Sequence, residues 1–227
     1  MTLTDQRSPV IRRAEPSDDQ ILIMLLVAAF FHGDLASHLI PEVADRASRY
    51  FPYFEIIAAH ALTAAHVDLI MDPDAAMPAA AAIWYPVGAD GITDDIPDYG
   101  ERLAAAVGPY LPAFAALDMA MHQHHPTGHD HDYLAFLAVH PVLQNRGLGS
   151  RLLEHHHAQL DPAGRPAYLE ATGDRNRRLY ERHGYTPLEP FPVADGGPPL
   201  RPMWRPGRPG KGQAARNDSA ASSGASQ

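Results

Sequence analysis

The chain has 227 residues, and its 18 lysine and arginine residues against 27 aspartate and glutamate residues give a formal net charge of −9 with neutral histidines. Hydrophobic residues make up 45% of it, enough to bury the core of one domain. An acidic balance argues against a nucleic-acid partner, because phosphates are neutralised by basic side chains. Cysteine is absent, which excludes disulfides, thiolate nucleophiles and zinc ribbons. Lys211 is the only lysine, so the core holds no candidate for a Schiff base or a lysine-bearing phosphate loop.

The N-terminal stretch contains one apolar segment and no visible secretory signal. Residues 1–16 lack a cationic region followed by an apolar one, so we expect a cytoplasmic protein. The apolar run Ile21–Phe31 has 11 residues, well short of the roughly 20 that a membrane-spanning helix needs. We therefore expect no membrane span and a buried helix, which starts at a capping box of Ser17 and Gln20 and ends at Gly33.

Alternating strands and helices follow this first helix. A second helix is predicted over Pro41–Leu62 from apolar residues at helical spacing. An alanine-rich stretch, Asp94–Met121, is broken by Gly108-Pro109 and predicts two short helices. The predicted strands are Val10–Arg13, the hairpin pair His66–Met71 and Ala79–Tyr85, Tyr133–Val139, Ala167–Thr172, and two final β segments before Pro206. Helices are predicted at about Gly147–Leu160 and Arg175–His183, which makes the second half an α/β unit.

The domain is expected to end near residue 205. Residues 206–227 contain no aromatic or large aliphatic side chain, and glycine, serine, alanine and proline dominate. Such a segment has too little apolar surface to offset the entropy of ordering. We therefore predict a single domain over residues 1–205 and a disordered tail over residues 206–227.

A glycine-rich turn stands between the predicted strand Tyr133–Val139 and the helix that follows. Its sequence is Gln-Asn-Arg-Gly-Leu-Gly-Ser, residues 144–150. A helix N-terminus presents unpaired N–H groups, and glycines let a diphosphate approach the backbone. A Walker loop would need a lysine here, and a dinucleotide fingerprint would need a glycine in place of Leu152. The turn predicts an anion site of another kind, with an ordinary strand–helix turn as the alternative.

The spacing of Gln144, Gly147 and Gly149 after this strand resembles the acetyl-CoA-binding signature of the GNAT superfamily of N-acetyltransferases. A second stretch, Tyr168–Thr172 followed by Asn176 and Leu179–Tyr185, resembles the next strand and helix of that superfamily. Two motifs in the right order make the resemblance specific over about residues 133–185.

The N-terminal part is similar to puromycin N-acetyltransferase and its small-molecule-modifying relatives, over Val10–Phe31 and Ala81–Trp84. The resemblance implies an α/β fold of the GNAT type. Its mixed, mostly antiparallel sheet would carry helices on both faces, and its two central strands would lie side by side and then splay.

The resemblance also implies that acetyl-CoA inserts between those two strands. Backbone N–H groups there could polarise the thioester carbonyl, because acyl transfer builds negative charge on its oxygen. The cofactor-binding residues implied in this way are Leu137, Ala138, Val139, Gln144, Asn145, Arg146, Gly147, Leu148, Gly149, Ser150 and Asn176.

Two residues are the catalytic candidates. By the family motif, Tyr180 would protonate the departing CoA sulfur, and Asn176, four residues earlier on the same helix face, would orient the cofactor. Glu170 shares a strand face with Tyr168 and Thr172 and could accept the proton of the amine. The alternatives are a tyrosine that packs its helix onto the sheet and a glutamate hydrogen-bonded within it.

The acceptor wall is expected just after the first helix, where the resemblance places it. Asp34 and His38 are spaced four residues apart there, and an acidic residue would suit a cationic amine. Phe30 and Trp84 could line an aromatic pocket. A solvated turn and ordinary core packing are the alternatives for these residues.

Histidine is frequent, with 14 residues, and raises the question of a metal. The triplet His155–His157 and the group at residues 122–131 lack the spacing of catalytic zinc helices. Consecutive helical residues point about a hundred degrees apart. We therefore expect solvent-exposed histidines and no metal site.

Together these features predict an enzyme that transfers acetyl from acetyl-CoA to the amine of a small molecule, antibiotics included, in a ternary complex. Direct attack is expected because no cysteine can carry the acetyl group. A protein or peptide N-acetyltransferase and a non-catalytic acetyl-CoA-binding sensor stay open as alternatives. A monomer or homodimer is expected, without nucleic-acid or membrane partners.

Overall fold

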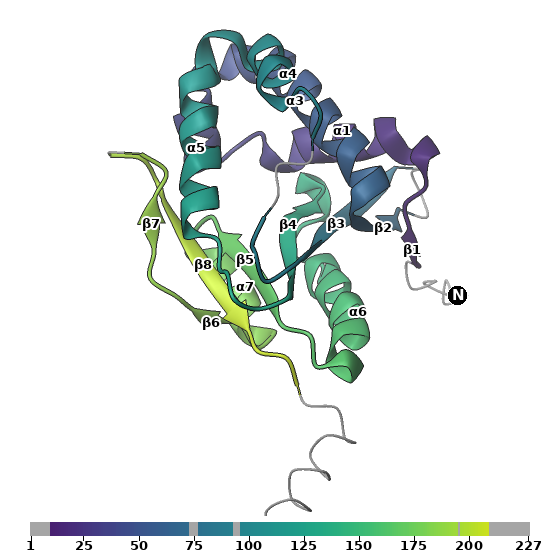
Figure 1. Ribbon diagram of the computed structural model, residues 1–227. Coiled ribbons are helices and arrows are strands. Elements are labelled where there is room, and N and C mark those ends of the chain that lie inside the picture. Colours follow the sequence, from purple (N-terminus) through teal and green to yellow (C-terminus); the bar gives the residue numbers. More distant parts are fainter. Residues whose placement is uncertain (1–9, 73–76, 93–95, 195, 209–227) are drawn as a thin grey trace, which may run out of the picture.

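The computed structural model describes residues 10–72, 77–92, 96–194 and 196–208 (Figure 1). Its strands form one eight-stranded sheet in the order β1-β2-β3-β4-β5-β8-β6, with β7 paired to β8. The pair β4–β5 is parallel and all other pairs are antiparallel. The strands are β1 (Ile11–Arg13), β2 (His66–Met71), β3 (Pro78–Val87), β4 (His131–Val139), β5 (Ala167–Ala171), β6 (Thr186–Pro187), β7 (Phe191–Pro192) and β8 (Pro199–Arg205).

Helices cover both faces of this sheet, as predicted. One face carries the larger core, built with α1 (Asp19–Phe30), α2 (Asp34–Leu39), α3 (Val43–Ala64), α4 (Tyr99–Val107) and α5 (Leu111–His124). The other face packs against α6 (Leu148–Ala163) and α7 (Asp174–Arg182). In Figure 1, α3, α4 and α5 rise above one part of the sheet, while α6 lies along the opposite part.

Helix α3 shows how the sequence forms this architecture. Tyr50, Phe54, Ile57 and Ala61 recur at intervals of three and four, and all four are buried. That spacing places them on one helix face, which packs into the larger core. The prediction of this helix is confirmed with shifted bounds.

The start of α1 differs from the prediction. The capping box is formed by Glu15 and Asp18, with the Glu15 N–H donating to Asp18 Oδ2 at 2.7 Å. Ser17 lies inside a short 3-10 helix, and Gln20 is already within α1. A proline at position 16 favours this extra turn, because its fixed φ suits the first residue of a helix. Gly33 has a φ of +116° and precedes α2, two residues beyond Phe31, the C-cap of α1.

Two helices interrupted at Gly108-Pro109 were predicted, and α4 and α5 confirm them. Among the described residues, the combined stretch Tyr99–His124 is long and apolar enough to pass as a membrane span by length and composition. Leu103, Val107 and Phe114 of this stretch are buried in the larger core. The apolar character of this stretch therefore reflects two helices that pack part of their surface into the core.

The C-terminal residues of the described part pack against the domain. Gly207 lies so close to the backbone of Gly164 and Arg165 that a side chain there would overlap it. Arg208 lies 3.9 Å from the carboxylate of Asp161. The remainder of the predicted tail, residues 209–227, falls outside the described residues, and its disorder stays a prediction.

Candidate active site

Strands β4 and β5 separate soon after they begin, and the gap between them forms the centre of the site. They pair at Asp132↔Ala167 and Tyr133↔Tyr168, and no further pair joins them within the described sheet. Ala135 has no partner on β3, because Ile83 pairs with Phe136 and Trp84 with Leu134. Such a bulge bends its strand. The backbone of β4 beyond the bulge is therefore left without a strand neighbour on the β5 side.

The turn before α6 has the shape of an anion site. Asn145 and Gly147 adopt left-handed backbone conformations, with φ values of 66° and 79°. The first bond of the helix runs from the Arg151 N–H to the Gly147 carbonyl, at 3.1 Å. The N–H groups of the three preceding residues stay outside the helix ladder and are available to an anion. Gln144 donates to the Val139 carbonyl at 3.4 Å and ties this turn to the end of β4.

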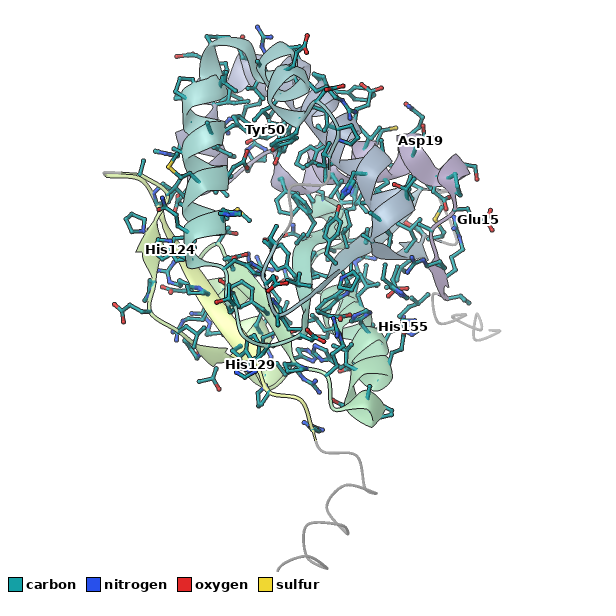
Figure 2. The ribbon with its side chains drawn as sticks, viewed as in Figure 1. Glu15, Asp19, Tyr50, His124, His129 and His155 are labelled. Atoms are coloured by element: carbon teal, nitrogen blue, oxygen red, sulfur yellow. The ribbon has the colours of Figure 1, made fainter. Side chains whose placement is uncertain are left out.

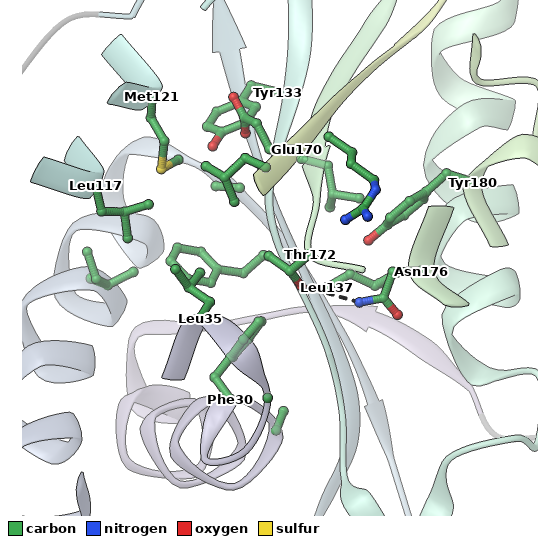
Figure 3. Close-up of a pocket in the computed structure, with 18 of the residues that line it drawn as sticks. Phe30, Leu35, Leu117, Met121, Tyr133, Leu137, Glu170, Thr172, Asn176 and Tyr180 are labelled. Atoms are coloured by element: carbon green, nitrogen blue, oxygen red, sulfur yellow. Dashed lines mark hydrogen bonds between the residues drawn. The ribbon is translucent and has the colours of Figure 1, made fainter. Parts of the chain in front are cut away.

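Helix α7 borders the same gap from the β5 side. Asn176 donates to the Thr172 hydroxyl at 3.4 Å. Tyr180 is buried one turn later and contacts the ring of Tyr185, with centroids 5.9 Å apart. Figure 3 shows the Tyr180 hydroxyl directed away from α7 toward Thr172. Burial raises the pKa of Tyr180 above its usual range, so the phenol keeps its proton at neutral pH.

Glu170 lies on β5 just past the last β4–β5 pair. Its Oε1 is buried with no hydrogen-bond partner among the described residues. Desolvation raises the pKa of its carboxyl to about 7. Interactions with the phenols of Tyr133 and Tyr168 lower this pKa, but by less than desolvation raises it. A carboxyl with a pKa near neutrality can exchange a proton at physiological pH, as general acid–base catalysis requires.

One cavity of about 1280 Å³ joins these groups (Figure 3). It runs from the α6 turn, past the β4–β5 gap, to a chamber bordered by α1, α2, α3 and α5. The predicted site residues that line it are Phe30, Asp34, Leu137, Val139, Gln144, Asn145, Gly147, Leu148, Gly149, Ser150, Glu170, Asn176 and Tyr180.

The two ends of the cavity differ in charge. The end beside α7 and β8 is lined by three arginines, Arg175, Arg182 and Arg201, and by one carboxylate, Asp174, which lies 3.4 Å from Arg201. The lining residues of the other end, drawn from α1–α5 and the segment after β3, include Asp34, Asp90 and Asp118 and no arginine or lysine. The first end therefore suits an anion and the second a cation.

The chamber at the acidic end is rich in phenols. Tyr85 forms a 3.1 Å hydrogen bond with His60, and their rings stack. Tyr99 donates to Asp118 at 3.0 Å. Tyr133 stands beside Glu170 in Figure 3, with Met121 of α5 opposite. Burial raises the pKa of Tyr85 and of Tyr133, so these hydroxyls are neutral hydrogen-bonding groups.

Four predicted site residues do not line the cavity. Trp84 is fully buried on the α6 face of the sheet and stacks on His156 at 4.1 Å, so its expected contact with substrate is wrong. His38 belongs to α2 but lies outside the lining, as does the exposed Arg146. The side chain of Ala138 is buried in the larger core, which leaves its backbone as the part nearest the gap.

The expectation of solvent-exposed histidines is also wrong for part of each group. His156 and His157 of the triplet are buried, and so are His125 and His131. The side chains of these three consecutive α6 histidines point in different directions, as expected, but two of the three point into the protein.

Sequence reasoning missed several lining residues. Tyr133, Asp118 and Met121 line the acidic end, and Arg175 and Arg201 the other. Tyr133 carried a signal that could have been used, because it lies near the start of the strand that precedes the glycine turn. Asp118 carried none, since an acidic residue on a helix of unknown placement usually faces solvent.

Part of the sequence, and the fold as a whole, are similar to those of GNAT-type acetyltransferases. Residues 112–187 match the acetyltransferase (GNAT) domain family. The match extends from α5 to β6 and includes both sides of the β4–β5 gap. The mixed sheet with helices on both faces is the GNAT fold, and the domain and the fold indicate an acetyltransferase.

Solved structures resemble the chain over most of its length. "Histone acetyltransferase HPA2 and related acetyltransferase" from Corynebacterium glutamicum is 27% identical, with 90% of this chain and 99% of that one covered and a TM-score of 0.69. Polyamine N-acetyltransferase from Drosophila melanogaster is 17% identical, with coverages of 88% and 100% and a TM-score of 0.54. Ribosomal-protein-S18-alanine N-acetyltransferase from Escherichia coli is 18% identical, with coverages of 88% and 95% and a TM-score of 0.52.

Proposed function

We propose that this protein transfers the acetyl group of acetyl-CoA to the amine of a small cationic molecule. The observation that carries the proposal is the single cavity with an arginine-lined end and an acidic end, which meet at the β4–β5 gap beside Glu170. An arginine-lined end next to a free helix N-terminus fits the phosphates of CoA. An acidic, phenol-lined end fits a protonated amine.

The residues of the chain fit acetyl-CoA along the whole of the first end. The turn at Asn145 and Gly147 offers N–H groups to a diphosphate, and the gap between β4 and β5 offers unpaired backbone to an extended pantetheine arm. Bound acetyl-CoA supplies the activated acetyl group. The N–H groups of Leu137, Ala138 and Val139 are the proposed donors to its carbonyl oxygen, where negative charge builds during transfer.

Two side chains are placed to handle the protons of the reaction. Glu170, with a pKa of about 7, takes a proton from the acceptor ammonium or from a water beside it. Tyr180 is protonated at neutral pH, and burial, which raises its pKa, keeps it neutral, so its hydroxyl can donate a hydrogen bond to the sulfur that leaves. Asn176, on the same face of α7, helps to orient CoA beside Tyr180.

Transfer is direct, within a ternary complex. The chain has no cysteine, so no enzyme thiol can carry the acetyl group between the two substrates. The amine enters from the acidic end and meets the acetyl group at the gap, which places Glu170 on the amine side.

A small acceptor is favoured over a peptide. Leu117, Asp118 and Met121 of α5 border the acidic end opposite Phe30 of α1, so the chamber is bounded on more than one side by helices. An extended peptide would need an open groove with a free strand edge. A sensor without turnover is disfavoured by a carboxyl tuned near neutrality inside the cavity.

Further parts of the proposal concern the setting of the enzyme. We place it in the cytoplasm, as a monomer or homodimer, with no nucleic-acid or membrane partner. Antibiotic amines such as puromycin are candidate acceptors, and resistance is then a candidate role.

The test is release of CoA from acetyl-CoA, followed with a thiol reagent across a panel of amines. A protein without cysteine contributes no thiol of its own. The panel contains puromycin, aminoglycosides, polyamines, agmatine and short peptides, with the matching alcohols as controls. Release with one class of small amine supports the proposal, and release with peptides alone supports a protein acetyltransferase. Tight acetyl-CoA binding without release for any amine would overturn the enzymatic proposal in favour of a sensor.

A further inference from the structure

A second cluster of polar side chains lies on the α6 face of the sheet, away from the cavity. His66 and Asp68 come from β2, and His156 comes from α6. One potential ligand atom from each of the three lies within 4.8 Å of the other two. His66 Nε2 is 3.0 Å from Asp68 Oδ1, and His155 Nε2 lies 3.9 Å from the same oxygen. None of these four residues lines the acetyl-transfer cavity.

Two buried polar atoms of this cluster have no hydrogen-bond partner within the described part of the chain. They are Asp68 Oδ2 and His156 Nδ1. Asp68 is 2% exposed and His156 is 3% exposed, so water is largely excluded from both. A carboxylate oxygen and an imidazole nitrogen left unpaired inside a protein cost free energy unless something binds them.

The orientation of His156 is fixed by its other nitrogen. Its Nε2 is 2.8 Å from Asp132 Oδ2, and Arg165 contacts the second oxygen of Asp132. Trp84 stacks on the ring, with centroids 4.1 Å apart and planes 10° from parallel. A carboxylate that holds one imidazole nitrogen while the other stays free is the usual outer arrangement of a metal-binding histidine.

We propose that His66, Asp68 and His156 bind a divalent transition-metal ion of the zinc class. Two imidazoles and one carboxylate are ligands that Zn²⁺ accepts, and the chain has no cysteine to offer a softer set. Bonds of about 2.0–2.1 Å in a tetrahedron place donor atoms roughly 3.3 Å apart, so the cluster needs small side-chain movements to close on an ion. His155 stands at the solvent side as a fourth donor.

A metal ion at this site would stabilise the fold and take no part in acetyl transfer. It joins β2 to α6, the helix whose N-terminal turn forms the anion site, from the face of the sheet opposite the acceptor chamber. His66 and His155 side chains are 31% and 42% exposed, which gives an ion access from solvent. Metal binding by the folded state alone raises the stability of the protein.

The experiment uses the full chain without a histidine tag, stripped with a chelator and then exposed to Zn²⁺ or Co²⁺. We expect about one tightly held ion per chain by elemental analysis after dialysis, a melting temperature that rises with Zn²⁺ and falls again with chelator, and a visible Co²⁺ spectrum typical of tetrahedral coordination.

Two variants and one control locate the ion. His66→Gln removes a half-exposed ligand, and Asp68→Asn keeps the side-chain shape while it removes the charge. Each is expected to weaken Zn²⁺ binding at least tenfold and to abolish the rise in melting temperature. His129→Gln removes an exposed histidine outside the cluster (labelled in Figure 2, as is His155) and is expected to bind as wild type.

Circular dichroism of the metal-free proteins checks that the variants are folded. The proposal is overturned if wild type holds no ion after dialysis, or if both cluster variants bind Zn²⁺ as tightly as His129→Gln does. Neither result depends on acetyl transfer, so the proposed function stands or falls separately.

Discussion

Glu170 stands two residues beyond Tyr168, whose pairing with Tyr133 is the last between β5 and β4. The carboxyl group therefore lies where the sheet opens, at the junction of the two ends of the cavity. Desolvation at this junction raises its pKa to about 7. Burial at the edge of the opening disfavours the charged form of the carboxyl, and this effect outweighs the hydrogen bonds that lower its pKa.

The first prediction concerns the pH dependence of turnover. A base with a pKa of about 7 must lose its proton before it can accept one, so kcat/KM should rise with pH through about 7. In Glu170→Gln this rise should disappear, and the rate at pH 8 should fall at least about 100-fold. The measurement is CoA release at saturating acetyl-CoA over a pH series.

Asp34→Asn is the control for this profile. Asp34 lines the same cavity but lies on α2, away from the β4–β5 gap. It should alter the KM for a cationic amine and leave the rise through pH 7 in place. A Glu170→Gln enzyme with an unchanged profile would show that another group is the base.

The second prediction is that Glu170 destabilises the fold at high pH. Its pKa is raised above the value of 4.5 expected for a free glutamate. The folded state therefore holds the proton more tightly, and the stability this gives is complete below pH 4.5 and lost as the pH rises through 7. Glu170→Gln should be more stable than wild type at pH 8, by up to about 3 kcal/mol.

Urea unfolding of the two proteins at pH 4.5 and pH 8 measures this difference. At the lower pH the side chain at position 170 is neutral in the folded state of both wild type and variant. The two free energies of unfolding should therefore nearly agree at pH 4.5. A gap of equal size at both pH values would contradict the raised pKa. A residue that lowers stability while it raises activity is the pattern expected of a catalytic group.

The third prediction concerns Tyr180. Tyr180→Phe keeps the ring that packs against Tyr185 but removes the hydroxyl. If the phenol donates a proton to the departing sulfur, kcat should fall about 100-fold while the KM for acetyl-CoA changes little. Steady-state kinetics of CoA release, with the amine found in the panel, measures both.

Tyr185→Phe is a matched control, because it makes the same chemical change on the neighbouring ring. Tyr185 lies outside the cavity lining, and its hydroxyl hydrogen-bonds His157 Nε2 at 3.0 Å. This variant should lose some stability and keep its kcat. Equal losses of kcat in the two variants would assign the effect to packing.

The glycine turn and the order of elements could be predicted from the sequence because their signals are local. Glycine at position 147 takes a left-handed φ, apolar residues at intervals of three and four mark α3, and short apolar runs mark the strands. The site depends on more than these signals. Ala135 is the extra residue of a bulge, and nothing in its immediate sequence distinguishes it from its neighbours in β4.

The placement of Trp84 shows why side-chain direction was harder to predict. Strand β3 is covered on both faces, and every residue from Pro78 to Trp84 is buried. A period of two separates core from solvent only in a strand with one exposed face, so it gave no direction here. His156 shows the same limit, since its partners on β2 and β4 are distant in sequence and meet it only through the register of the sheet.

The last prediction tests the turn before α6. Gly147 has a φ of +79°, and no heavy atom lies within 4 Å of where a Cβ would stand. Gly147→Ala is therefore strained by the backbone and not by crowding, at a cost of about 1–2 kcal/mol. We expect a lower melting temperature and weaker acetyl-CoA binding by calorimetry, because relief of the strain would turn the N–H groups away.

Two control variants test this explanation. Gly147→Asn tolerates the left-handed region and should keep more of the affinity. Gly149→Ala, whose Cβ would meet Leu137 and Leu179 at an ordinary 3.6 Å, should fold with little loss of stability. If alanine at 147 bound acetyl-CoA as wild type does, the turn would not be the phosphate site.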